Sequence, residues 1–504
     1  MVSLLFFKQV QVSDMQSVSS KLTGYVYTVV AVSLLLRLFF IGQYDLLAEE
    51  AYYWNYATHL DFGYLDHPPM VAVLIKLFIM LFGTHEFAVR CPAILCWGIA
   101  TYYSYRWCEL IQIGSGRFAV LLLSILPFFF LSSAVMTPDL PLIAAWSAAL
   151  YYLYRAICLG QRSMWYWAGV AVGLGCLSKY TMVLVIGTTA LYLLTSANTR
   201  RWLGRKELYL AAGIILLLFS PVIYWNATHE WLSFTFQSTR RFHQSRIYFS
   251  LHEVLGLLVL FLTPIGILGL GRFFKKNERF QLDPASQWFM QCYTLVPLLF
   301  FGAVSLTHGT KWNWIGPGLL ALIPWLALCM AHQESWVRQW LKTGYILIFA
   351  YSVLFFCTTF GQPVFLNYVL LGKMISWEKL TQDFYQIATE EAKNSGKEVI
   401  FIPLERYTIA SELAFYQAKQ TQSHAQRKPY LINSPAEFGM SGLMFDLWAD
   451  YDLKNKTIVF IGLIPDVFDT TPTEPLSPIK KIWAQSQGYG AHIRPIYYRV
   501  VQNF

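Results

Sequence analysis

The spacing of long apolar segments limits what this chain can fold into more than any other feature. A helix needs about 20 predominantly apolar residues to cross the hydrocarbon core of a bilayer. Eleven stretches of the sequence approach or reach this length. They lie at 22–42, 87–107, 117–135, 140–158, 165–180, 182–198, 208–225, 250–271, 287–306, 314–331 and 343–361. The spacing therefore predicts an α-helical polytopic membrane protein with about eleven transmembrane helices.

The low content of charged residues supports the same class. Of the 504 residues, 56% are hydrophobic and 13% are charged, whereas charged residues make up about 25% of soluble domains. The net charge of +9 comes mostly from Lys and Arg in short loops between apolar segments, where such residues set orientation. We therefore expect membrane lipids, and no nucleic acid, around this chain. The eight cysteines lie in or beside apolar segments without zinc-type spacing, so we expect small core residues and no metal ligands among them.

The distribution of basic residues predicts the orientation. With the N-terminus in the cytoplasm, the cytoplasmic ends of the segments carry 16 Lys and Arg and the opposite ends carry 7. Cytoplasmic loops are enriched in these residues. An odd number of spans then puts the C-terminal region outside. The exceptions on the outer side are Lys76, Arg90, Lys179, Arg240, Arg241, Arg246 and Lys311.

A change in composition near residue 365 predicts two domains. We expect residues 1–364 to form the membrane domain, with a long first outer loop at 43–86, and residues 365–504 to form a small α/β domain. The apolar stretch Met70–Phe82 is too short to span a membrane and is typical of a helix at the interface. In the C-terminal part, the pattern predicts a helix at Tyr407–Gln417. It also predicts strands at Lys397–Pro403, Pro429–Ile432, Thr457–Gly462 and Ile493–Val501.

Adjacent acids follow the first apolar segment. Glu49 and Glu50 begin the sequence EEAYYW, which also contains Tyr53. Acids at a membrane edge are costly unless they are solvated or functional. A carboxylate here can act as a general base toward an attacking hydroxyl or amine. Alternatively, the pair stabilises the first turn of an outer helix, where acids are favourable.

Three further polar groups interrupt the apolar pattern on the outer side. Asp66 and His67 precede two prolines, which restrict the backbone; this is either a plain turn or a fixed site in which a protonated His67 meets a phosphate. Asp139 lies in a short outer turn, either as the N-cap of the next span or as a second functional carboxylate. Lys179 either extends to water as an anchor or points into a cavity.

The outer loop at 226–249 is unusually rich in basic and aromatic residues. It contains His229, Arg240 and Arg241, and Lys311 occupies a similar place in a later loop. Because basic residues on this side run against the orientation rule, they indicate an anionic partner. Phosphate suits the forked donors of Arg, and anionic lipid headgroups are the alternative.

Together, the outer loops combine carboxylates with cations. This pattern suits a displacement reaction in which an acid activates the nucleophile and cations stabilise a leaving phosphate. The sequence lacks a P-loop and a GxGxxG motif, which disfavours a soluble nucleotide-sugar donor. A lipid phosphate held at the membrane surface is therefore the expected donor.

These motifs resemble the bacterial glycosyltransferase family 39/PMT-2 group of the GT-C superfamily, which is similar to lipid A aminoarabinose transferases and protein O-mannosyltransferases. The matching motifs are EEAYYW at 49–54, GYLDHPPM at 63–70, TPDLPL at 137–142, LSKYT at 177–181, the YWN-x-x-H-x-W run at 224–231 and KWNW at 311–314. The resemblance covers most of the membrane region.

The resemblance implies a function and roles for individual residues. It implies inverting transfer of a sugar from a polyprenyl-phosphate donor to lipid A or lipopolysaccharide, another glycan or a protein, on the periplasmic face of a bacterial inner membrane. Glu49 takes the place of a catalytic Asp, Glu50 matches the Glu after it, and Asp139 matches the acid of the second outer loop. His67 stands where lipid A-modifying relatives carry Lys.

The remaining outer residues complete the expected site, and one alternative function stays open. We expect substrate to be bound by Asp66, His67, Tyr53, Lys179, His229, Arg240, Arg241 and Lys311. No cofactor is predicted, although some GT-C enzymes use a divalent metal and others need none. The alternative function is a glycolipid transporter or flippase, which the many spans and the phosphate-seeking loops also suit.

Overall fold

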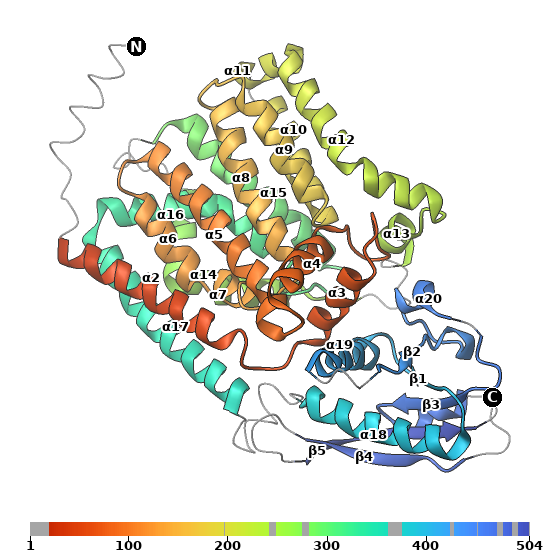
Figure 1. Ribbon diagram of the computed structural model, residues 1–504. Coiled ribbons are helices and arrows are strands. Elements are labelled where there is room, and N and C mark those ends of the chain that lie inside the picture. Colours follow the sequence, from red (N-terminus) through yellow and green to blue (C-terminus); the bar gives the residue numbers. More distant parts are fainter. Residues whose placement is uncertain are drawn as a thin grey trace. The chain divides into compact units, whose positions relative to one another are not determined.

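The computed structural model describes the chain as two compact units of largely helical structure (Figure 1). The described residues are 20–195, 197–240, 248–274, 282–360, 375–423, 428–450, 452–470, 477–485 and 492–502. The first unit contains the described residues of 1–37, 93–134 and 138–351. The second contains those of 38–92, 135–137 and 352–504. The second unit therefore joins the predicted first outer loop to the C-terminal residues.

Helices occupy all eleven of the predicted apolar segments. The helices that lie wholly or partly in the first unit are α2 (Ser20–Phe40), α5 (Glu86–Ile111), α6 (Gly116–Ile125), α7 (Pro127–Ser132), α8 (Asp139–Ile157), α9 (Met164–Cys176), η1 (Tyr180–Met182), α10 (Val183–Thr195), α11 (Ala197–Arg200), η2 (Arg201–Gly204), α12 (Lys206–Thr228), α13 (Leu232–Thr235), the π-helical η3 (Phe236–Arg240), α14 (Leu251–Phe273), α15 (Pro284–Val304), η5 (Gly316–Leu322), α16 (Ile323–His332) and α17 (Glu334–Phe360). The helical fold class is thus confirmed.

Within the described ranges, five helices are long and apolar enough to cross a membrane: α2, α12, α14, α15 and α17. A bent pair, Tyr180–Thr195 with Asn198–Gly204, gives a sixth if it is counted as one span. The other helices fall short in length or apolar content by this measure. The chain is a membrane protein, and the count of eleven spans stays a prediction.

The interior of the first unit is built around α8, which is buried along almost its whole length. It packs on α9, which in turn packs on α12. The approach of α9 to α12 depends on a small residue, because a Cβ added at Gly169 would lie 2.8 Å from the carbonyl oxygen of Ala211. Small residues allow helix backbones to come close where lipid offers no hydrophobic driving force. The eight cysteines are buried or half-buried and free, which confirms the expectation that they pack in the interior.

The second unit contains a five-stranded mixed sheet in the order β2-β1-β3-β5-β4. Its strands are β1 (Val399–Pro403), β2 (Leu431–Ile432), β3 (Thr457–Gly462), β4 (Lys480–Gln485) and β5 (His492–Val501). Strands β2, β1 and β3 are parallel, and β5 runs antiparallel between β3 and β4. The four predicted strands are confirmed. The fifth, β4, was not predicted because KKIWAQ is a short, charged edge segment without a hydrophobic run.

The second unit also contains helices and short 3-10 segments, of which α3 and α4 belong to the first outer loop. They are α3 (Ala48–Thr58), α4 (Met70–Phe82), α18 (Trp377–Ser395), α19 (Thr408–Ser423), η7 (Ala436–Phe438), α20 (Phe445–Trp448) and η8 (Pro465–Thr470). Both faces of β1 and β3 are buried, as expected for strands covered on two sides. One face packs in a core that includes Ile400, Phe438 and Phe460, and α18 packs on β1, β3 and β4.

The first outer loop is helical and packs directly on this C-terminal structure. Helix α3 packs on both α4 and α19. The helix predicted at Met70–Phe82 is confirmed with the same bounds, and the helix predicted at Tyr407–Gln417 corresponds to α19. Helix α18 was missed, although Trp377, Leu380, Phe384 and Ala388 recur at helical spacing and are all buried. The division into domains 1–364 and 365–504 stays a prediction.

Candidate active site

Glu50 is held by a buried ion pair with Arg90, within the second unit. The Arg90 Nη2 atom lies 2.7 Å from Glu50 Oε2, and both side chains are fully buried. Arg90 Nε also donates to the carboxylate, at 2.9 Å to Oε1. The remaining Arg90 N–H groups donate at 2.8 Å to the carbonyl oxygens of Ile41, Tyr44 and Asp45. Every donor of this guanidinium therefore has an acceptor.

The carboxylate of Glu50 also accepts two backbone hydrogen bonds. Leu47 N donates to Oε2 at 3.0 Å, and Met136 N donates to Oε1 at 3.0 Å. The bond from Leu47 satisfies an N–H at the start of α3, as an acid in the first helical turn can do. Glu50 thus fixes the start of α3, which matches the alternative that the acid pair stabilises an outer helix.

Glu49 precedes this anchored residue in the first turn of α3 and is half-buried. Tyr407 directly precedes α19, and its pKa is raised to about 12, first by burial and then by the negative charges of Glu49 and Asp66. The ring of Tyr407 lies 4.7 Å from that of Tyr52 on α3. Glu49, Asp66 and Tyr407 therefore share one electrostatic environment.

Asp66 and His67 are placed against the tyrosines of α3. The Tyr56 hydroxyl donates to Asp66 Oδ1, and the Tyr56 ring stacks on Tyr64 with centroids 3.8 Å apart. The His67 ring lies edge-on to Tyr53, at 5.7 Å between centroids. Both Asp66 and His67 are half-buried. The structure thus brings Glu49, Tyr53, Asp66 and His67 together in the second unit.

Asp139 and Lys179 form a second buried pair, within the first unit. Lys179 Nζ lies 2.7 Å from Asp139 Oδ1, and the two side chains are 8% and 3% exposed. Asn313 Nδ2 donates to Asp139 Oδ2 at 2.7 Å. Asp139 is the first residue of α8 and follows the N-cap Pro138, so the expectation that it is the N-cap is wrong by one position. Lys179 is paired in the interior, and the alternative that it extends to water is also wrong.

The structure describes only some of the basic residues that we expect to bind phosphate. His229 ends α12 with its ring stacked on Trp225, at 4.2 Å between centroids. Lys311 is exposed. Arg240 ends η3, where only its backbone is described, and Arg241 lies outside the described residues.

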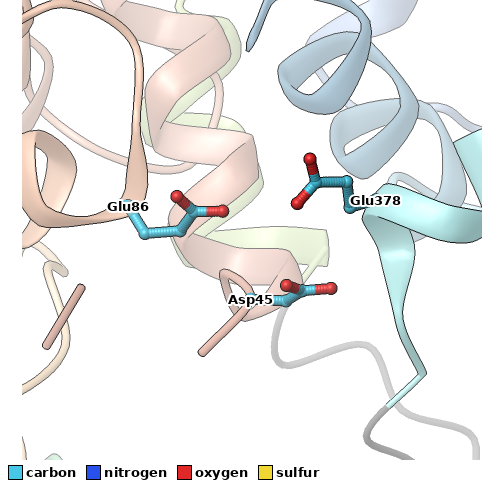
Figure 2. Close-up of side chains that lie close together, drawn as sticks. All are labelled: Asp45, Glu86 and Glu378. Atoms are coloured by element: carbon cyan, nitrogen blue, oxygen red, sulfur yellow. The ribbon is translucent and has the colours of Figure 1, made fainter. Parts of the chain in front are cut away.

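One group of residues was missed by the sequence analysis. Within the described ranges, the carboxylates of Asp45, Glu86 and Glu378 come close enough together to hold a metal ion (Figure 2). They are far apart in the sequence, and each follows or begins a helix with no motif around it. Only the packing of α18 and α19 on the first outer loop brings them together.

Comparison with known proteins agrees with this architecture. The family model described as dolichyl-phosphate-mannose-protein mannosyltransferase, PMT-2, matches residues 66–225. The match covers 160 of the 504 residues. It contains Asp66, His67, Asp139 and Lys179, whereas Glu49 and Glu50 lie before it.

A curated relative and a solved structure extend the comparison. Lipid A galacturonosyltransferase RgtD of Rhizobium johnstonii is 25% identical over 194 residues, which make up 37% of this chain and 39% of that protein. The match therefore spans about two fifths of that curated relative. ArnT from Cupriavidus metallidurans in the apo state is 15% identical, with a TM-score of 0.62 over 95% of this chain and 98% of that one.

The same ArnT bound to undecaprenyl phosphate is similar at a TM-score of 0.63, with 14% identity and coverage of 95% and 98% of the two chains. At this level of identity the likeness concerns the fold. The chain has an ArnT-like GT-C fold, as predicted, whereas the count of eleven spans and the location of the C-terminal residues stay predictions. The family description and the curated relative both name transferases, and neither supports a glycolipid transporter.

Proposed function

We propose that this protein is a membrane glycosyltransferase that moves a sugar from a polyprenyl-phosphate donor to an acceptor, with inversion in a single displacement. The GT-C fold, the PMT-2 segment at 66–225 and the similarity to a lipid A galacturonosyltransferase support this proposal. The acceptor is lipid A or lipopolysaccharide, another glycan or a protein, and the curated relative favours lipid A. The site lies on the periplasmic side of a bacterial inner membrane.

The observation that carries the proposal is the different placement of two adjacent acids. The Glu50 carboxylate accepts hydrogen bonds from Arg90, Leu47 N and Met136 N. Its role is therefore to position α3. Glu49 is half-buried beside this anchor. A general base must be held in place and still reach its substrate. We therefore assign Glu49 as the base and Glu50 as the residue that positions it.

In the proposed reaction, the acceptor hydroxyl or amine attacks the anomeric carbon of the donor sugar. A new bond forms from the acceptor atom to this carbon while the bond from the carbon to the phosphate oxygen breaks. The electron pair of the broken bond stays with the polyprenyl phosphate. The acceptor proton passes to the Glu49 carboxylate. The increasing negative charge on the phosphate requires nearby cations.

The candidates for binding this phosphate are His67, His229, Arg240, Arg241 and Lys311. His67 is favoured because it lies against Tyr53 on the helix that carries Glu49. Tyr53 and Asp66 are proposed to contact the sugar. Asp139 and Lys179 remain proposed site residues, although each neutralises the charge of the other. They are therefore better suited to shape the site than to supply a free charge.

The proposed topology has the C-terminal domain, residues 365–504, in the periplasm after about eleven spans. Its packing on the first outer loop through α3 and α19 supports this, because Glu49 lies in the first turn of α3. Labelling single cysteines introduced on exposed positions of α18 with a membrane-impermeant reagent tests the location. Labelling in intact spheroplasts is expected, and labelling only after lysis would contradict the periplasmic position.

Mass spectrometry of lipid A and of surface glycans, with and without the gene, tests the function itself. We expect one glycan species to lose the mass of a single sugar in the deletion strain. Purified protein should then transfer that sugar from its undecaprenyl-phosphate donor to the unmodified acceptor. Unchanged glycans together with undecaprenyl-phosphate movement across vesicles would instead indicate a transporter.

A further inference from the structure

Three carboxylates from separate segments converge in the second unit. Asp45 lies between α2 and α3, Glu86 is the first residue of α5, and Glu378 lies in the first turn of α18. One oxygen atom of each lies within 4.8 Å of the others. Figure 2 shows the three side chains pointing toward one another. Glu86 is buried and the other two are half-buried.

The side chain of Lys419 on α19 contacts this cluster. Its Nζ atom lies 2.8 Å from Glu86 Oε1 and 3.1 Å from Glu378 Oε2. The Lys419 ammonium thus contacts two of the three carboxyl groups. The nearby Arg90 uses its charge on Glu50.

A fourth carboxyl group, that of Glu412, belongs to the same helix as Lys419. The side chain of Glu412 on α19 is fully buried. Neither of its oxygens receives a hydrogen bond from any residue in the described part of the chain. A buried polar group without hydrogen-bond partners is costly. In a native structure, such a group indicates a nearby ion or water molecule that interacts with it.

The direction of Glu412 follows from the helix that carries it. Residues three or four apart share one helix face, so Glu412, Tyr416 and Lys419 form one stripe of α19. The Tyr416 hydroxyl accepts a hydrogen bond of 2.9 Å from Leu46 N, next to Asp45. Lys419 reaches Glu86 and Glu378. The stripe therefore faces the cluster. Burial raises the pKa of Glu412, and the negative charges of Asp45, Glu50 and Glu86 contribute.

We propose that Asp45, Glu86 and Glu378 bind a hard divalent cation, and that water bound to this cation donates to Glu412. Oxygen-only carboxylate ligands suit Ca²⁺, Mg²⁺ and Mn²⁺. The cation links the segment before α3 to the starts of α5 and α18 and thereby stabilises the packing of the first outer loop on the C-terminal structure. Lys419 competes with it for Glu86 and Glu378. The site is separate from Glu49, and its existence does not depend on the transfer activity.

Binding of Mn²⁺ to the full-length protein in detergent, after EDTA treatment and desalting, tests the site. Electron paramagnetic resonance measures the free Mn²⁺ that remains at each point of the titration. We expect one bound Mn²⁺ per chain. Glu378→Gln should weaken binding at least about tenfold, because the number of carboxylates tunes the affinity of such sites. The matched control is Glu390→Gln, an exposed acid on the same helix, which should bind like the unchanged protein.

A second variant distinguishes loss of the metal site from misfolding of the protein. Lys419→Gln removes the competing ammonium and should bind Mn²⁺ more tightly than the unchanged protein, a gain that misfolding does not produce. The proposal is overturned if the unchanged protein binds no Mn²⁺ at millimolar concentration. Equal binding by Glu378→Gln and the unchanged protein would also overturn it, since the metal would then bind elsewhere. If Lys419 alone neutralises the cluster, Lys419→Gln destabilises the protein without any gain in Mn²⁺ affinity.

Discussion

Glu50 in the second unit and Asp139 in the first are both buried acids paired with a buried cation, but they are held in different ways. Arg90 binds Glu50 through two nitrogen atoms and places its other donors on three backbone carbonyls. Lys179 binds Asp139 through one contact, and Asn313 supplies a second. The first pair forms a saturated network, whereas the second is a small cluster. The Oδ1 atom of Asn313 is buried without a hydrogen-bond partner among the described residues.

The difference follows from the chemistry of the two cations. A guanidinium has five donors in a fixed fork, while an ammonium is a compact point charge. The Arg90 fork can therefore join three backbone carbonyls to one carboxylate, whereas the Lys179 ammonium contacts the Asp139 carboxylate through one oxygen. We infer that the first pair is a structural junction. The second pair has fewer contacts among the described residues, so its loss should cost less stability.

The largest expected effect is the loss of stability on removing Arg90. Arg90→Ala leaves the Glu50 carboxylate buried and three carbonyls without donors, which should lower the free energy of unfolding by about 3–5 kcal/mol. Denaturant unfolding in detergent, followed by tryptophan fluorescence, measures this change. Arg106→Ala is the matched control, because Arg106 lies exposed on the same helix and should change stability by no more than about 0.5 kcal/mol. Equal stability of the two variants would show that the junction contributes little.

The second effect separates the two adjacent acids. Glu49→Gln should lower kcat by about 10²- to 10⁴-fold, the usual contribution of a general base, with little change in unfolding. Glu50→Gln should instead lower the free energy of unfolding, since it leaves the charge of Arg90 unpaired. Transfer assays on folded protein, with unfolding measured on the same samples, give both quantities. Full activity of Glu49→Gln would remove Glu49 from the proposed mechanism.

The sequence predicted much of the fold but could not separate these acids. Apolar length and alternating patterns located the apolar helices, α19 and four of the strands, because local sequence determines them, whereas the amphipathic α18 was missed. The proposed roles of Glu49 and Glu50 rest on the contact of Glu50 with Arg90, forty residues later, and no local pattern predicts that contact. Arg90 and Lys179 were counted as outer basic residues, yet both are buried ion-pair partners. The acidic cluster of Asp45, Glu86 and Glu378 likewise arises only from tertiary packing.

A smaller effect is expected at the second pair. Lys179→Met leaves Asp139 with Asn313 alone and should cost about 1–3 kcal/mol of stability, the penalty of a buried group that loses a partner. Asp139→Asn added to Lys179→Met removes the unpaired charge and should recover part of that loss. A double-mutant cycle measured by denaturant unfolding gives the coupling energy, for which about 0.5–3 kcal/mol is usual between contacting residues. A coupling near zero would mean that the two residues do not depend on each other.

The smallest effect is a pH dependence at Asp45, which lies beside Glu86 and Glu378. Burial raises the pKa of Asp45 from its ordinary value of 3.8 to about 6 in the folded protein. The folded state therefore holds the proton more tightly than the unfolded state, and the stability from this group is present below pH 3.8 and lost as the pH rises through about 6.

In EDTA, the difference in the free energy of unfolding between Asp45→Asn and the unchanged protein should increase in favour of the variant from pH 4 to pH 7. The slope should be at most about 1.4 kcal/mol per pH unit. Trp377 N, which donates to Asp45 Oδ2, can donate to the amide oxygen of Asn instead, so the comparison isolates the charge. With Mn²⁺ present the slope should reverse, because a metal binds the ionised carboxylate. A flat difference in both conditions would mean that Lys419 already neutralises Asp45 as completely as Arg90 neutralises Glu50.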